Sequence, residues 1–350
     1  MADLLDCTLR DGSYVNRFQF TARDTEFLCG KLEECGLKYI EIGHGLGLGA
    51  YRRGGELTAA ATDERYLQAA SKSLSSAWFG MFCIPGIATL EDVDMAHDYG
   101  MKFIRVGVNV ADVDLSAKYI ERAKKHGMLV CTNYMKSYVV SPAVFATCAK
   151  VSRSFGADVL YIVDSAGGML PEQVESYVRA VQDNVEIDIG YHGHHNLGLA
   201  VSNSLMCAKM GARFIDTCLQ GLGRSAGNAP TEQVAMIFNR MGLKTDLDLL
   251  KLLNLGYETI RPIITQIGLN PIDLVSGFAL FHTSYMPLIK QYSSQYCVDP
   301  LELIIELCKE DQVNAAPELV ERIASGLVPK DRDVFFGKFH LERYYVNEQQ

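Results

Sequence analysis

Short apolar segments alternate with longer segments of helical period through the first 240 residues of the chain. The apolar segments are rich in β-branched and aromatic residues, which favour buried strands, and eight of them recur. They lie at 4–8, 39–43, 78–83, 103–108, 129–134, 159–163, 187–191 and 214–217. The helical segments between them include 22–35, 63–73, 115–126, 142–155, 171–181 and 199–210.

Glycines mark the ends of several helical segments. Gly36, Gly100, Gly127, Gly156 and Gly211 each stand between a helical segment and the next strand, as is typical of helix C-termini. Strands that read as continuous apolar runs indicate a parallel sheet covered on both faces, and eight such units in about 240 residues favour closure. The pattern predicts an α/β fold, a (β/α)8 TIM barrel. A doubly wound open sheet is the structural alternative.

The alternation stops after Met241. The later segments of helical period are 247–255, 273–291 and 300–309. Because no Pro-, Gly- or Ser-rich linker separates them from the barrel, we predict a barrel domain at 1–241 and a C-terminal helical domain at 242–350 that packs on it. The closing segment 334–350 is compatible with a docking tail or an interface strand.

Composition and charge exclude several classes of partner. The 33 basic and 42 acidic residues give a net charge of −9, and Lys and Arg are not concentrated anywhere, so we expect no nucleic-acid partner. No apolar run reaches the roughly 18 residues of a membrane span, and the first residues lack a signal-peptide pattern. The ten cysteines are scattered without a CxxC pair, which predicts reduced thiols in a cytoplasmic protein.

Polar side chains gather where the predicted strands end, which is where barrel enzymes place their chemistry. These residues are Arg10, Asp11, Glu41, His44, Arg105, Asn109, Asn133, Asp164, Ser165, His192, His194, Asp216 and Gln220.

The strongest local signal is YHGHHN at 191–196. Because residues two apart on a strand point to the same side, His192 and His194 can present two imidazoles to one point. Asp11, on the nearby first strand, is the natural carboxylate. Two imidazoles and one carboxylate leave coordination positions open for substrate, which predicts a catalytic divalent metal. The alternative is a pair of polar residues in a surface loop.

Five motifs occur in order along the barrel. They are DCTLRDGS at 6–13, EIGHGLGLG at 41–49, VDSAGG at 163–168, HGHHNLGLAVSNS at 192–204 and GLGRSAGNAP at 221–230. In this order they resemble the 4-hydroxy-2-oxovalerate aldolase family, metal-dependent pyruvate aldolases of the HMG-CoA lyase-like barrel superfamily. The resemblance covers the whole barrel and continues more weakly to about residue 310.

The resemblance implies a carbon–carbon lyase that cleaves a 4-hydroxy-2-oxo acid into pyruvate and an aldehyde, or forms it from them. Asp11, His192 and His194 would hold a divalent ion, usually Mn²⁺ or Mg²⁺, although these ligands also suit Zn²⁺ or Co²⁺. Arg10, Asp11 and Ser165 would bind the substrate, and Arg10 would help the metal to stabilise a pyruvate enolate. The alternatives are a structural ion pair for Arg10 and a local turn role for Ser165.

Three more residues belong to the expected site. Glu41 and His44 either face the substrate or lie behind it, with Glu41 pairing to Arg10 or Asp11. Asn228 resembles a metal-proximal asparagine of the lyase branch.

The resembled aldolases commonly pair with an acylating aldehyde dehydrogenase. Such a pairing and a homo-oligomer are both open expectations for this chain.

The sequence departs from the family pattern at two positions. Tyr14 stands directly after RDGS, where the resembled aldolases have a histidine as catalytic base, and a phenol with a pKa near 10 is a poor base at neutral pH. His282, in GFALFHTS at 277–284, stands where the family has a tyrosine. We hypothesise that the two residues have exchanged positions around the aldehyde half of the substrate, that His282 supplies the imidazole, and that the acceptor aldehyde differs. The alternative is an ordinary helix histidine and a tyrosine that fills space.

Two other functions compete with the aldolase. One is a Claisen-type synthase that uses acetyl-CoA, although the roughly 110 residues after the barrel are few for its usual accessory parts. The other is a catalytically lapsed barrel that acts as a binding subunit, an idea motivated by the missing histidine at Tyr14.

Overall fold

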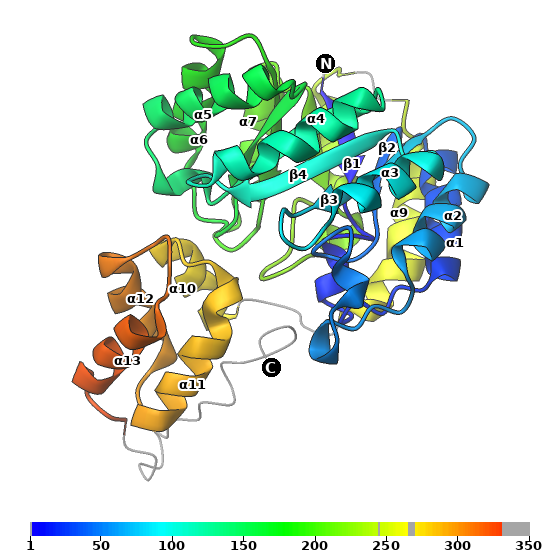
Figure 1. The fold of residues 1–350 in the computed structure, drawn as a ribbon. Helices are drawn as coiled ribbons and strands as arrows, with labels where there is room; N and C mark the ends of the chain where they lie inside the picture. The colour runs from blue at the N-terminus through cyan, green and yellow to red at the C-terminus, as the bar shows by residue number, and fades with distance from the viewer. Residues whose placement is uncertain (1, 244–245, 265–269, 331–350) are drawn as a thin grey trace.

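The computed structural model describes residues 2–243, 246–264 and 270–330, so the closing segment 334–350 lies outside the described residues. The strands are β1 (Asp3–Asp6), β2 (Tyr39–Ile42), β3 (Trp78–Cys83), β4 (Phe103–Asn109), β5 (Leu129–Met135), β6 (Val159–Asp164), β7 (Asp188–Gly193) and β8 (Phe214–Thr217). All pair in parallel, and β1 pairs with both β2 and β8, which closes the barrel (Figure 1). The predicted TIM barrel is confirmed, and the open sheet is wrong.

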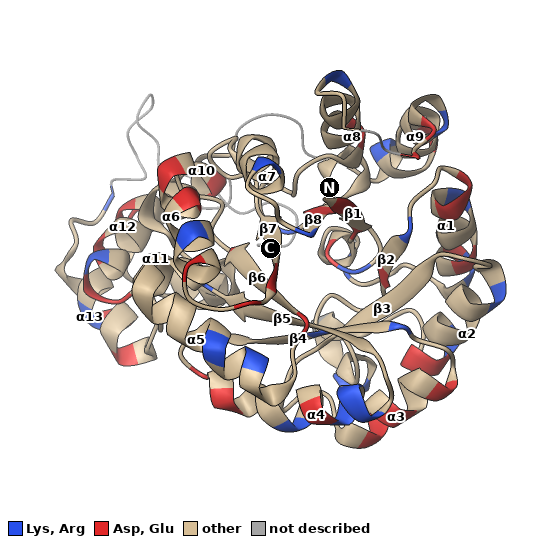
Figure 2. Ribbon diagram, turned by 90° about the horizontal axis from the view of Figure 1, so that it is seen from above, with Lys and Arg blue, Asp and Glu red and all other residues tan. Residues whose placement is uncertain are grey.

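Helices surround the barrel. They are α1 (Ala22–Glu34), α2 (Asp63–Ser73), α3 (Leu90–Asp98), α4 (Ala117–Lys125), α5 (Pro142–Phe155), α6 (Pro171–Gln182), α7 (Ala200–Lys209) and α8 (Thr231–Arg240). Thr21 and Thr89 begin α1 and α3 with capping boxes, in which the threonine and the aspartate three residues later satisfy each other's backbone N–H groups. The five glycines predicted to follow helices all have positive φ, from 71° to 104°. In Figure 2, acidic and basic residues are interspersed on these outer helices and form no single basic face.

An apolar cluster inside the barrel surrounds a buried cation. Leu5, Phe103, Tyr161 and Phe214 belong to a buried cluster inside the barrel. Arg105 lies among them, fully buried, with its Cζ 4.5 Å from the centre of the Tyr161 ring. A guanidinium in such surroundings requires carboxylate partners, because burial of an unpaired charge is very costly.

The described residues after the barrel form five more α-helices. They are α9 (Leu249–Leu255), α10 (Pro271–Ala279), α11 (Met286–Tyr296), α12 (Pro300–Glu310) and α13 (Pro317–Gly326). Leu252 and Leu255 of α9 join the core of the barrel, whereas a second hydrophobic core extends from Ile272 to Ala324. Helices α10–α13 accordingly form their own group beside the barrel (Figure 1). No single described helix is long and apolar enough to span a membrane, although the bent pair Pro271–Ala279 and Thr283–Tyr296 passes by length and composition.

The segment predicted as one helix at 273–291 is broken, and that expectation is wrong. Helix α10 ends because Leu280 adopts a positive φ of 57°, and the ring of His282 then caps the short turn that follows. Pro287 stands in the first turn of α11. Backbone N–H groups there have no partner within the helix, so a proline, which lacks an N–H, costs no hydrogen bond. His282 is therefore not on the face of a continuous helix; it lies in a buried break between two helices.

Helix α10 lies directly on the loops at the carboxyl ends of the strands. A Cβ atom on Gly168, in the loop after β6, would come within 2.0 Å of the backbone oxygen of Gly277. A Cβ on Gly277 would in turn lie 2.9 Å from the side chain of Leu197 in the loop after β7. Asn196 Nδ2 donates to the backbone oxygen of Asp273 at 2.9 Å. The two glycines permit this close approach, which holds the C-terminal helices over the strand ends.

Candidate metal centre and active site

The three predicted metal ligands meet at the carboxyl end of the barrel. Asp11 lies in the turn after β1, His192 in β7, and His194 directly after that strand. One ligand atom from each lies within 4.8 Å of the others, and all three residues are buried. Burial lowers the pKa of His194 to about 3, so its ring is neutral, and its Nδ1 is buried without a hydrogen-bond partner among the described residues. A divalent cation fits this donor set.

Asp11 is held as a charged group by its neighbours. Its Oδ1 accepts a hydrogen bond from Arg10 Nη1 at 2.8 Å, and its Oδ2 accepts one from Asn228 Nδ2. Burial alone would raise the pKa of Asp11, but the positive charge of Arg10 outweighs it and lowers the pKa below its usual value. Gly223 makes room for this contact, since a Cβ there would lie 2.2 Å from Asn228 Nδ2. Asp11, a candidate metal ligand, is therefore ionised and held in a fixed position by its neighbours.

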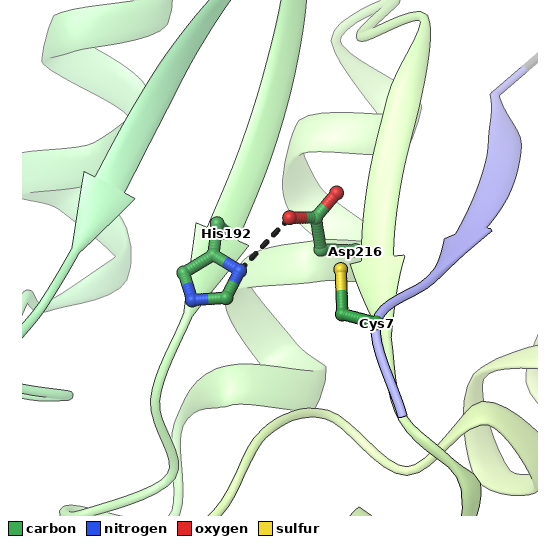
Figure 3. A group of neighbouring side chains, drawn as sticks. All are labelled: Cys7, His192 and Asp216. Carbon is green, nitrogen blue, oxygen red and sulfur yellow. Dashed lines mark hydrogen bonds and ion pairs between the residues drawn. The ribbon is translucent and has the colours of Figure 1, made fainter. Parts of the chain in front are cut away.

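His192 is oriented by a carboxylate behind it. Its Nδ1 lies 2.8 Å from Asp216 Oδ2, as the dashed line in Figure 3 shows. Burial would raise the pKa of Asp216, but the charge of Arg105 and the bond to His192 lower it. Asp216 therefore accepts the hydrogen of Nδ1, which leaves the Nε2 lone pair for a cation. Carboxylates commonly orient metal-binding histidines in this way.

A second group of possible ligands, also drawn in Figure 3, shares His192. Cys7, His192 and Asp216 offer ligand atoms within 4.8 Å of one another. However, the Arg105 guanidinium donates to Cys7 Sγ at 3.1 Å and to Asp216 Oδ2, so a positive charge already occupies this position. Burial and the charge of Asp216 also raise the pKa of Cys7 well above its usual value, which keeps it a thiol. A thiol beside a guanidinium is a poor cation ligand.

A buried ionic chain supports both the metal centre and Arg10. Glu41 Oε2 accepts hydrogen bonds from Arg10 Nε and Arg105 Nη1, each at 2.7 Å. Arg105 also donates to Asp216, which bonds His192. The chain therefore runs from Arg10 through Glu41, Arg105 and Asp216 to His192, a candidate metal ligand. Arg10 is thus both an ion-pair partner and part of the site.

Arg105 and Asp216 were predicted at strand ends, without a role in the site. The available signal was an arginine within an apolar strand, FIRVGV, because a charge that points into a barrel must find a partner of opposite sign. The identity of that partner depends on which residues face inward on other strands, so the sequence pattern alone left it undetermined.

Two other predicted residues are engaged within loops. His44 Nε2 lies 3.0 Å from the backbone oxygen of Leu57, and its Nδ1 accepts the N–H of Leu46 at 3.0 Å. Both ring nitrogens of His44 are thus satisfied by backbone groups. Ser165 Oγ accepts the backbone N–H of Lys136 at 3.0 Å, which joins the loops after β5 and β6.

Tyr14 and His282 converge on Arg224, a residue of the loop after β8. Arg224 Nη2 lies 3.3 Å from His282 Nε2, and Arg224 Cζ lies 5.7 Å from the centre of the Tyr14 ring. Burial and then the charge of Arg224 lower the pKa of His282 well below its usual value, so its ring is neutral. The residues at the two exchanged positions therefore flank the same guanidinium, one from the barrel and one from the C-terminal helices.

The chain is similar to known proteins over most of its length. The sequence model of the HMGL-like family matches residues 2–257. The 4-hydroxy-2-oxovalerate aldolase of Moorella thermoacetica is 35% identical over 331 residues, which are 93% of this chain and 97% of that protein. The chain belongs to the HMGL-like family. Another relative of this HMGL-like chain is 4-hydroxy-2-oxovalerate aldolase 2 of Rhodococcus jostii, 36% identical over 93% of the chain and 94% of that protein.

The HMGL-like fold extends to more distant structures. The carboxyl transferase domain of Rhizobium etli pyruvate carboxylase superposes with a TM-score of 0.74, covering 92% of this chain and 59% of that chain. At 12% identity this likeness concerns the fold alone. The resemblance inferred from the five sequence motifs is confirmed at the level of the family.

Proposed function

We propose that this chain is a divalent-metal-dependent pyruvate aldolase, which cleaves a 4-hydroxy-2-oxo acid into pyruvate and an aldehyde or joins the two. The observation that carries the proposal is the buried group of Asp11, His192 and His194 beside a paired Arg10. Relatives at about 35% identity over nearly the whole chain are named 4-hydroxy-2-oxovalerate aldolases. One carboxylate and two imidazoles suit Mn²⁺ or Mg²⁺, and also Zn²⁺ or Co²⁺.

Arg10 prepares the site for the charge that develops on the 2-oxo oxygen of the substrate. A bound divalent ion would supply Lewis-acid stabilisation of that charge. Glu41 and Asp11 hold Arg10 through Nε and Nη1, and within the described chain Nη2 has no hydrogen-bond partner. This third nitrogen is free to donate to a substrate oxygen. Because the guanidinium is fixed in advance, little reorganisation is needed when the charge appears.

His282 serves as the base in this proposal. Its Nδ1 lies 2.7 Å from the Ser284 hydroxyl and 3.2 Å from the Ser284 backbone nitrogen, and its Nε2 faces Arg224. Base catalysis needs the tautomer in which Nδ1 donates to Ser284 Oγ and Nε2 keeps its lone pair, so in this tautomer Nδ1 no longer accepts the backbone N–H of Ser284. Nε2 then takes the proton of the 4-hydroxyl as the C3–C4 bond breaks and the aldehyde forms. Tyr14 lies on the same side of the site as His282, and it supplies the phenol that the family has at the position of His282.

The proposed function is tested with the purified full chain, stripped of metal with a chelator and then supplied with one divalent ion at a time. We expect pyruvate and an aldehyde to condense only after Mn²⁺ or another suitable ion is restored. In D₂O, without aldehyde, we expect the same ion to promote exchange of the pyruvate methyl protons, which reports enolate formation alone. Absence of both reactions with every ion would overturn the proposal.

His282→Ala is expected to lower kcat for aldol cleavage by about 10²–10⁴-fold, the usual contribution of a positioned general base. The pH profile should also lose the limb that reports the base, while the metal content stays unchanged. His97→Ala is the matched control, because His97 lies at the exposed end of α3. An unchanged rate and an unchanged pH profile in His282→Ala would show that the histidine has only a structural role.

Assembly stays a prediction. Pairing with an acylating aldehyde dehydrogenase and self-association both remain proposals for this chain. Co-purification would test the first, and sedimentation would test the second.

A further inference from the structure

Four basic side chains lie in or above the barrel mouth, and they differ in how their charge is balanced. Arg10 and Arg105 both pair with Glu41, and each has a second carboxylate partner. Arg224 and Lys136 form no ion pair with any described residue. The site therefore contains two positive charges that the described part of the chain does not neutralise.

Arg224 has unused hydrogen-bonding capacity. Its Nε is buried and has no hydrogen-bond partner among the described residues. Its contacts are the neutral ring of His282 at Nη2 and the face of Tyr14. A buried guanidinium N–H without an acceptor is costly, and the cost is removed when a ligand supplies the acceptor.

Arg224 is also close to the metal centre. A Cβ atom on Gly223, the residue before Arg224, would lie 3.0 Å from Asp11 Oδ2, so this loop runs directly past the carboxylate. The Arg224 guanidinium therefore extends from a loop that contacts Asp11, and it lies beside Tyr14 and His282.

Lys136 places a second charge on the same side. It lies just after β5 with a φ of 59°, and its Nζ donates to the Tyr285 hydroxyl at 2.7 Å and to the Val313 backbone oxygen at 2.8 Å. Both acceptors are neutral. Burial, followed by the charge of Arg224, lowers the pKa of Lys136 to about 8, so it remains mainly protonated at neutral pH. Asp311 acts on it only at longer range.

We propose that Arg224, supported by the charge of Lys136, binds an anionic group at the far end of the acceptor aldehyde. The substrate is then an aldehyde that carries a carboxylate or a phosphate, and the aldol product is a 4-hydroxy-2-oxo acid with a second anionic group. This inference rests on the proposed function and names its substrate class. Arg10 and the metal ligands face the pyruvate half, whereas Arg224 contacts Tyr14 and His282, which flank the aldehyde half. An uncharged short aldehyde would leave both cations unbalanced.

The test compares aldehydes that differ in charge but little in shape. Pyruvate and Mn²⁺ are supplied with succinic semialdehyde or its neutral methyl ester, and with glyceraldehyde 3-phosphate or glyceraldehyde. We expect kcat/KM to favour the anionic member of one pair by about 10–100-fold, the usual effect of one charge-assisted hydrogen bond. The pair that shows the preference identifies the anion as carboxylate or phosphate.

Variants at Arg224 assign the preference to this residue. In Arg224→Met the ratio of the two kcat/KM values should fall toward one, and Arg224→Lys, which keeps the charge but loses the planar fork, should retain part of it. Arg179→Met is the matched control, because Arg179 is an exposed residue of α6 paired with Glu175. The control should keep the wild-type ratio.

The outcomes separate this inference from the proposed function. If the wild-type chain exchanges pyruvate methyl protons in D₂O but prefers neither anionic aldehyde, the inference is wrong and the aldolase assignment stands. If Arg224→Met raises KM for pyruvate and slows the exchange itself, Arg224 binds the pyruvate carboxylate, and the inference is again wrong. If no exchange and no condensation occur with any ion, the proposed function fails and the inference fails with it.

Discussion

Asp11→Asn is expected to remove the divalent cation from the purified chain and to lower the rate of aldol cleavage by at least about 10²–10³-fold. The substitution keeps the shape of the side chain but removes its charge. In the wild type that charge is stabilised by Arg10, and Asp11 is the one carboxylate in the group that it forms with His192 and His194. Metal per chain after dialysis, measured by elemental analysis, and the cleavage rate at saturating Mn²⁺ provide the two readouts.

The control for this prediction is Asp188→Asn. Asp188 begins the same strand that carries His192, but its side chain is half-exposed in a surface ion pair with Arg213. The metal content and rate of this variant should equal those of the wild type, since exposed ion pairs contribute little. Full metal occupancy and a normal rate in Asp11→Asn would show that this carboxylate is not a ligand.

Arg105→Met is expected to lower the free energy of unfolding by about 3–5 kcal/mol, the usual cost of removing one partner from a buried ionic group. Arg105 is fully buried and joins Glu41 to Asp216 inside the barrel. Without it Glu41 keeps Arg10, but Asp216 keeps only His192 as a hydrogen-bond partner among the described residues. Denaturant unfolding at fixed metal concentration measures the change.

The same variant has a second readout. Asp216 orients His192, and loss of Arg105 is expected to displace Asp216. The variant should therefore bind a divalent metal about 10–100-fold more weakly. Arg122→Met on α4, where Arg122 pairs with Asp94 at the surface, should change stability by less than about 1 kcal/mol and leave metal affinity unaltered. Wild-type stability and metal affinity in Arg105→Met would contradict the role of the buried chain.

The parts of the fold that depend on neighbouring residues were predictable from sequence. Apolar strands, helical periods and the glycines at helix ends are local patterns, and eight repeats of them left few architectures to choose from. The spacing of His192 and His194 is equally local, because a strand repeats every two residues. Asp11 followed from the closure of the barrel, which brings the ends of β1 and β7 to one rim.

Local patterns failed where a short break or a distant contact decides the structure. The segment 273–291 has a continuous helical period, yet Leu280 takes a left-handed conformation and divides it into two helices. Helix α13 was not among the predicted helices. The pairing of Arg105 with Glu41 and Asp216 joins three separate strands, so no single stretch of sequence contains it.

The sequence by itself determined the barrel, the family and the set of polar residues at the strand ends, because periodicity and ordered motifs are written along the chain. Only the tertiary structure decided which partners each of those residues has. It places Asp216 behind His192, and it brings Tyr14 and His282, from opposite ends of the chain, to the two sides of Arg224. Charge balance in a buried site depends on distances between atoms, and those distances exist only once the barrel has closed and α10 lies across its rim.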